Sequence, residues 1–153
     1  MIHNLLSTRV TLNRDGISES SKCNLCNAEE QTVHHLPINC TLTVDFWILF
    51  QNCWYQKTNE TITLSTSHIL YCWHDRTKHW QALNYCLLIS KYCIFWTSLC
   101  GDVLEFQNFL LSITGKLEIL LKRDRDGKNG TSKILSCLAF RFNTLWMFNL
   151  IYI

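Results

Sequence analysis

The chain has 153 residues, of which 48% are hydrophobic and 17% are charged. This composition excludes an intrinsically disordered chain and suffices for one domain with a modest core. The formal net charge of +2 is close to neutral, whereas proteins that bind nucleic acid through their overall charge are usually strongly basic.

Nine cysteines are many for a chain of this length. Four polar residues interrupt the apolar run at its start: His3, Asn4, Ser7 and Arg9. We therefore expect no secretory signal, and reduced thiols in a cytoplasmic or nuclear protein. The alternative is a disulfide-rich secreted chain, against which the odd cysteine count argues.

The first predicted element is a short helix over residues 2–13. Its apolar residues share one face at helical spacing, and Gly16 stands where a helix stops. Three basic residues lie on the approach to the next segment: Arg9, Arg14 and Lys22. They are candidates for contacts with nucleic-acid phosphates, and the alternative is a solvated basic face, which the sequence by itself favours.

Residues 23–40, CNLCNAEEQTVHHLPINC, form the segment that we call the knuckle. Its spacing is Cys23-x2-Cys26-x8-His35-x4-Cys40. Structural Zn²⁺ takes thiolate and imidazole ligands in a closed tetrahedron. A Cys-x2-Cys turn lets two sulfurs reach one ion, and a short loop returns the second pair of ligands. The pattern therefore predicts a zinc site, and its asparagines suit tight turns.

The ligand set of the knuckle has alternatives. His34 competes with its neighbour His35 for the fourth position. The knuckle could also hold reduced core cysteines and surface histidines with no metal. With four protein ligands, the metal has no open position, so we assign it no catalytic role.

A helix is predicted to begin shortly after Cys40. Its apolar stripe repeats at helical spacing: Leu42, Phe46, Leu49, Phe50 and Cys53. Trp47 and Trp54 flank this stripe. Aromatic residues here would stack on nucleobases or pack the helix onto the knuckle, and we favour packing.

The polar run of residues 56–67 predicts a connecting loop with a brief strand at Ile62 to Leu64. Downstream come four residues that can bind a metal: His68, Cys72, His74 and His79. Their order matches no zinc pattern that we can justify, so we interpret the histidines as ordinary titratable residues.

Residues 79–100 predict a helix that is apolar on several sides and therefore buried. Cys86, Cys93 and Cys100 recur in steps of seven, as small core residues would. Gly101 ends this helix. A second helix is predicted to pack on it as a hairpin through a seam of Phe106, Leu110, Ile113, Leu117 and Leu120.

Residues 122–133, KRDRDGKNGTSK, predict a solvated linker, and residues 134–153 form an apolar tail. The tail is about as long as a bilayer span. Arg141 near its centre opposes insertion, so we regard a membrane anchor as the weaker interpretation. The other interpretations of the tail are a helix that completes the core and non-native sequence read past the end of a degraded element.

Residues 5–47 resemble the zinc-binding segment after the polymerase domain of non-LTR (LINE-like) retrotransposon reverse transcriptases. Three positions depart from that family, namely Gln31, His34 and Pro37, and none of them removes a ligand. In the resemblance His35 takes the ligand position of a His-Leu pair. The likeness continues loosely through the helical residues up to 121. The matching positions are Arg14, Gly16, Ile17, Cys23, Cys26, Thr32, Val33, His35, Leu36, Cys40 and Trp47.

The sequence thus predicts an all-α fold with a small Cys3His zinc knuckle near the N-terminus, a helical hairpin and an apolar C-terminal tail. We divide the chain into a knuckle region with flanking helices (1–55), a connecting loop (56–78), the hairpin (79–121) and a linker with the tail (122–153).

Catalytic motifs are missing from the sequence: there is no paired-aspartate strand of a polymerase palm, no nucleophile triad and no Gly-rich phosphate loop. We therefore predict that the chain is not an enzyme by itself.

The resemblance implies the C-terminal part of a retrotransposon polyprotein that binds Zn²⁺. Its implied partners are single-stranded RNA or target DNA and the polymerase domain of the same polyprotein. The alternatives are a zinc-stabilised protein-interaction module without nucleic-acid binding and a tail-anchored membrane protein.

Overall fold

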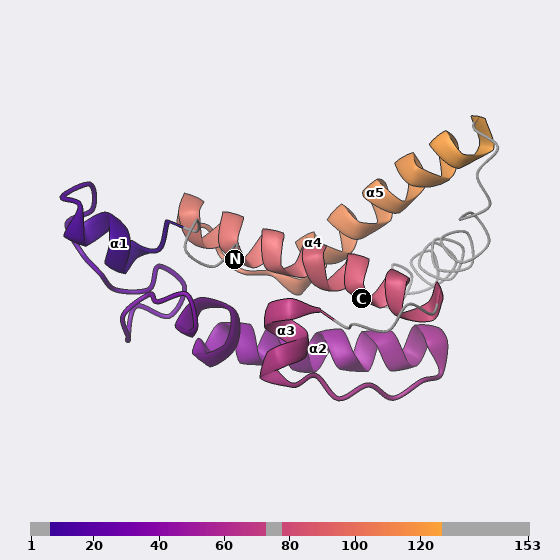
Figure 1. Cartoon of the computed structure of the whole chain (residues 1–153), viewed down its shortest axis with the longest axis horizontal. Helices are drawn as coiled ribbons and strands as arrows, with labels where there is room; N and C mark the ends of the chain where they lie inside the picture. Colours follow the sequence, from indigo (N-terminus) through magenta and orange to yellow (C-terminus); the bar gives the residue numbers. More distant parts are fainter. Residues whose placement is uncertain (1–6, 73–77, 127–153) are drawn as a thin grey trace, which may run out of the picture.

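The computed structural model describes residues 7–72 and 78–126, which are almost entirely helices, turns and loops. The elements are α1 (Arg9–Arg14), the π-helical turn η2 (His35–Asn39), α2 (Thr41–Thr58), α3 (Thr66–Tyr71), α4 (Lys78–Cys100) and α5 (Phe106–Asp126). These ranges contain no strand, only an isolated bridge between Lys22 and Glu30. The all-α prediction is confirmed. Figure 1 shows α2 and α4 running along the long axis of the molecule and α5 leaving α4 at an angle. The division into four regions stays a prediction.

The first helix is shorter than the predicted range. Thr8 is its N-cap, since the Thr8 hydroxyl accepts a hydrogen bond from the backbone N–H of Thr11 at 3.4 Å. The helix therefore begins at Arg9; residues 2–6 of the predicted helix lie outside the described residues. Gly16 has φ +72°, a left-handed conformation that glycine adopts without a steric penalty. The predicted stop at Gly16 is confirmed.

The buried face of α2 differs from the predicted stripe. Leu42 and Leu49 are 42% and 47% exposed. Thr43 instead faces inward and donates its hydroxyl hydrogen to the Leu36 carbonyl at 2.8 Å. The Trp47 indole N–H likewise donates to the Pro37 carbonyl at 2.7 Å. These two hydrogen bonds to the knuckle turn the tryptophan side of α2 toward the core. The buried residues of α2 are Thr43, Phe46, Trp47, Phe50 and Trp54, so both tryptophans pack.

The aromatic residues of α2 also meet the first turns of α5. Phe46 lies 5.2 Å from Phe106 and 5.0 Å from Phe109 between ring centroids, and both pairs meet edge to face. Such arrangements are favourable for aromatic quadrupoles. This contact joins the knuckle end of the molecule to the last described helix.

One segment predicted as a loop and a strand is partly helical. Helix α2 continues to Thr58, and α3 occupies Thr66–Tyr71. The expected strand at Ile62 to Leu64 is wrong: the Leu64 N–H donates to the side-chain oxygen of Gln51 at 3.0 Å, so it pairs with α2 and not with another strand.

Helix α4 is buried on one side and open on another. Leu83, Cys86, Leu87 and Ile94 are in the core, as predicted. Burial on several sides is wrong, because Tyr92, Trp96 and Leu99 are each about half exposed. Cys100 is likewise exposed, while Cys93 is partly buried. Figure 1 shows α5 leaving α4 at an angle, so α5 covers only part of α4.

The hairpin seam is present at the start of α5. Ile113 is buried, Phe106 and Leu110 are partly buried against the core, and the Lys116 ammonium lies 4.7 Å from the centroid of the Tyr92 ring. The side chains of Leu117 and Leu120 lie outside the described residues.

The C-terminal predictions are mostly beyond the described part of the chain. Helix α5 extends to Asp126, so the first residues of the expected linker, 122–126, are helical. The apolar tail, 134–153, lies outside the described residues. Among the helices that the structure describes, none combines the length and hydropathy of a membrane span.

Candidate metal centre

A tight turn presents the first two cysteines of the knuckle. The Asn27 N–H donates to the Cys23 carbonyl at 2.8 Å, and the Cys23 N–H donates to the Glu29 carbonyl at 2.8 Å. Asn27 has φ +55°, in the left-handed region that asparagine tolerates. The chain therefore reverses directly after Cys26 and both thiols lie on the inside of the turn.

The second pair of candidate ligands is held by η2. The Cys40 N–H donates to the His35 carbonyl at 2.8 Å, an i to i+5 bond that closes one π-helical turn. This bond explains the His-x4-Cys spacing, since it keeps the two residues at one side of the turn. The His35 N–H donates to the Thr32 hydroxyl at 2.9 Å, and Cys40 is the N-cap residue of α2.

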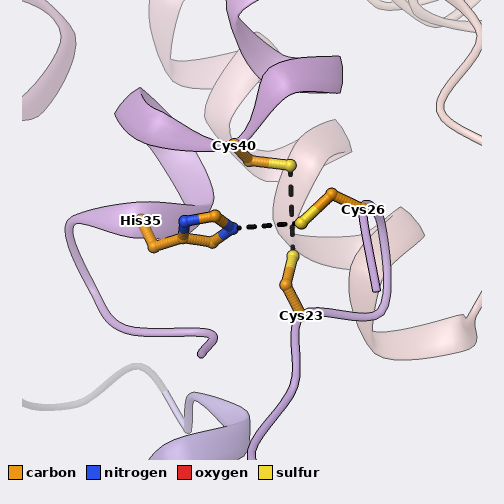
Figure 2. A group of neighbouring side chains, drawn as sticks. All are labelled: Cys23, Cys26, His35 and Cys40. Atoms are coloured by element: carbon orange, nitrogen blue, oxygen red, sulfur yellow. Dashed lines mark hydrogen bonds between the residues drawn. The ribbon is translucent and has the colours of Figure 1, made fainter. Parts of the chain in front are cut away.

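The four predicted ligands converge (Figure 2). The Sγ atoms of Cys23, Cys26 and Cys40 and one ring nitrogen of His35 all lie within 4.8 Å of one another. Cys23 Sγ is 4.0 Å from Cys40 Sγ, and Cys26 Sγ is 3.4 Å from His35 Nε2. With Zn–S bonds of about 2.3 Å, a tetrahedral site separates two sulfurs by about 3.8 Å. The donor set and its spacing therefore fit Zn²⁺.

His34, the rival of His35, is exposed and does not belong to this group. His35 is 4% exposed, and Cys23 and Cys40 are fully buried. The geometry thus favours His35, as the sequence prediction does.

The Glu29 carboxylate lies beside the imidazole of His35, outside the group of four candidate ligands. Its Oε2 lies 3.1 Å from His35 Nδ1. This distance is short enough for a hydrogen bond, but the two groups are not aligned for one. A small rotation of the exposed Glu29 side chain would align them. A carboxylate at this position would favour the tautomer with the proton on Nδ1 and leave Nε2 for an ion, as in the usual outer contact of a zinc-bound histidine. Glu29 was not predicted from the sequence, although an acidic residue close to the ligands was the available signal.

The thiols have opposite electrostatic environments. Burial raises the pKa of Cys23 to about 11, with the neighbouring thiols of Cys40 and Cys26 adding to it. Burial also acts to raise the pKa of Cys26, but backbone N–H groups of Glu29 and Ala28 and the His35 side chain outweigh it and lower that pKa to about 6. Cys26 is therefore the more acidic of these two thiols.

The three candidate phosphate contacts lie around the approach to the knuckle. Arg9 Nε donates to the Ser20 carbonyl at 3.2 Å. Arg14 is exposed and lies 3.3 Å from the carboxylate of Asp15. Lys22 is exposed directly before Cys23. Their role in binding nucleic acid stays a prediction.

The later histidines form no second metal group among the residues that the structure describes. His68 has a structural role, since its Nδ1 accepts the Ser65 N–H at 3.2 Å and completes the capping box of α3. His74 and the side chain of His79 lie outside the described residues.

Comparison with known proteins agrees with this geometry. Residues 1–47 match the family model described as zinc-binding in reverse transcriptase. No curated protein and no solved structure matches the chain. The N-terminal segment is therefore of the zinc-binding kind found in reverse transcriptases, as the resemblance predicted, and Zn²⁺ is the cofactor that its Cys3His group suits.

Proposed function

We propose that the chain is a non-catalytic, structural zinc module from the C-terminal part of a retrotransposon reverse transcriptase polyprotein. Cys23, Cys26, His35 and Cys40 are its metal ligands. The observation that carries this proposal is the convergence of these four donors in a segment that matches the zinc-binding family. Four protein ligands complete the tetrahedron, which is typical of structural sites.

The metal would fix how the helices meet. Its ligands come from the turn at Cys23 and Cys26 and from both ends of η2, and η2 contacts α2, α3 and α4. The Asn24 amide also donates to the Ser98 carbonyl of α4 at 2.8 Å. Closing the zinc shell would thus hold the start of α2 against α4.

We further propose that the module contacts single-stranded RNA or target DNA beside the polymerase domain of the same polyprotein, in the cytoplasm or nucleus. Support comes from the position of Arg9, Arg14 and Lys22 before the knuckle and from the reverse-transcriptase family of residues 1–47. Three phosphate contacts on a single strand correspond to a salt slope of roughly −2.

The test is a fluorescence titration of labelled single-stranded RNA with the zinc-loaded full chain at two salt concentrations. Replacing Arg9 and Arg14 by Ala should remove most binding at low salt. The matched control, Lys122→Ala with Arg123→Ala, removes the same charge from a region where Asp124 and Asp126 oppose it. Equal loss in both variants, or no binding by the parent chain, would defeat the nucleic-acid proposal.

A second candidate is a protein-interaction module. The near-neutral net charge favours it, as do large apolar side chains exposed along α2. The partner would be the polymerase domain of the polyprotein. This candidate would be supported if the parent chain does not bind RNA at low salt. The exposed residues are Leu42, Val44, Ile48, Leu49 and Tyr55.

A further inference from the structure

A hollow of about 450 Å³ lies between α1, the knuckle and the C-terminal end of α4. These elements gather at one end of the molecule (Figure 1). Its size falls within the range of small-molecule sites. The zinc proposal makes no use of this hollow.

Two buried side chains in its wall carry oxygens without a hydrogen-bond partner among the described residues. They are Oε1 of Gln31, which is 3% exposed, and Oγ of Ser98, which is 1% exposed. A buried polar group left unpaired costs about 1–3 kcal/mol. Both residues line the hollow, and the Ser98 hydroxyl reorients by rotation about one bond. Neither oxygen is accessible as it stands, so a ligand with N–H donors would satisfy them once rotation of the two side chains turns them toward the hollow.

The rest of the lining combines an apolar wall with a cation. Phe95 and Leu99 of α4 supply the apolar surface, and an aromatic or aliphatic platform is what an unstacked base requires. Arg9 also lines the hollow, and its Nε–H donates to the Ser20 carbonyl. A guanidinium has five N–H donors, so this bond orients the group and leaves four for a phosphate.

We propose that the hollow binds one unstacked nucleotide of a single strand, which rests on the proposed nucleic-acid function. The phosphate lies at Arg9 and the base lies on Phe95 and Leu99. Amino hydrogens of the base donate to the oxygens of Gln31 and Ser98. The Gln31 amide oxygen and the Glu19 carboxylate at the rim only accept hydrogen bonds, whereas the Ser98 hydroxyl both donates and accepts. With this excess of acceptors, the site favours bases with an exocyclic amino group over uracil, whose edge has one N–H. Because the Asn24 amide ties the knuckle to Ser98, the zinc site shapes one wall of the hollow.

The test compares short single-stranded oligo(C) and oligo(U) RNA by fluorescence anisotropy, with the zinc-loaded full chain at low salt. The parent chain should bind oligo(C) about fivefold more tightly than oligo(U), the effect of about one hydrogen bond. Leu99→Glu should weaken oligo(C) binding at least about tenfold. Leu88→Glu is the matched control, because Leu88 lies on the same helix, is 55% exposed against 50% for Leu99, and is not part of the hollow.

A second variant, Gln31→Leu, removes one acceptor at similar volume and should abolish the preference for oligo(C) while the zinc content stays at the parent value. Equal binding of the two RNAs by the parent chain would overturn the proposed base preference and with it this site. Equal loss in Leu99→Glu and Leu88→Glu would overturn it too, since repulsion by any added carboxylate would then explain the effect. In both cases RNA binding survives, whereas a parent chain that binds neither RNA refutes the underlying function.

Discussion

Removal of the Glu29 carboxylate tests whether His35 binds zinc through Nε2. In Glu29→Ala the imidazole loses the carboxylate 3.1 Å from Nδ1, while the backbone groups of residue 29 that bond to the knuckle remain. The tautomer with a free Nε2 is then less favoured. We expect weaker zinc binding by an otherwise intact chain.

The magnitude follows from the exposure of the carboxylate. Loss of an outer partner of a zinc ligand typically costs 10–100-fold in metal affinity. The Glu29 side chain is 72% exposed, so water can take its place at Nδ1. We therefore expect the lower end, about tenfold, or about 1.4 kcal/mol.

The assay is competition for zinc against a chromophoric chelator, with the full chain under reducing conditions. Glu30→Ala is the matched control: it removes the same charge one residue away, from a carboxylate that accepts the Ser21 hydroxyl at 3.2 Å. Equal zinc affinities of the two variants would refute the orienting role of Glu29 and leave only a general loss of negative charge.

Three further outcomes can be measured on the full chain. His35→Ala should abolish stoichiometric zinc binding by mass spectrometry, and His34→Ala should preserve it; the reverse result would exchange their roles. Trp47→Phe removes the 2.7 Å hydrogen bond from the indole N–H to the Pro37 carbonyl and should lower the free energy of unfolding by about 1 kcal/mol; a chemical-denaturation midpoint equal to that of the parent would contradict this. Zinc affinity should rise by at least about tenfold between pH 7 and pH 8, because Cys23, with its pKa raised to about 11, must release its proton on binding; a flat profile would show that this thiol is not a ligand.

The sequence by itself determined the candidate ligand set and the helical class. Cys-x2-Cys and His-x4-Cys are local spacings, and local hydrogen bonds realise them: the turn that returns the chain to Cys23, and the π-helical bond from Cys40 to His35. Helix ends marked by Gly16 and Gly101 were predictable for the same reason, since positive φ values of 72° and 73° suit glycine.

Tertiary structure decided which sides of these elements face one another. The predicted stripe of α2 contained Leu42 and Leu49, yet the helix buries Thr43 and Trp47 because the Leu36 and Pro37 carbonyls of the knuckle accept their hydrogen bonds. Helical periodicity gives the hydrophobic pattern of a helix, but a helix that is apolar nearly all round has no unique inward face until a partner supplies one.

The same limit applies around the metal centre. Glu29 is a neighbour of the ligands in sequence, but only the folded turn brings its carboxylate to His35. The contact between Asn24 and Ser98 joins residues 74 positions apart, and no local pattern encodes that distance. Local spacing therefore specified the candidate ligand set, whereas the packing of α4 on the knuckle created the hollow beside it.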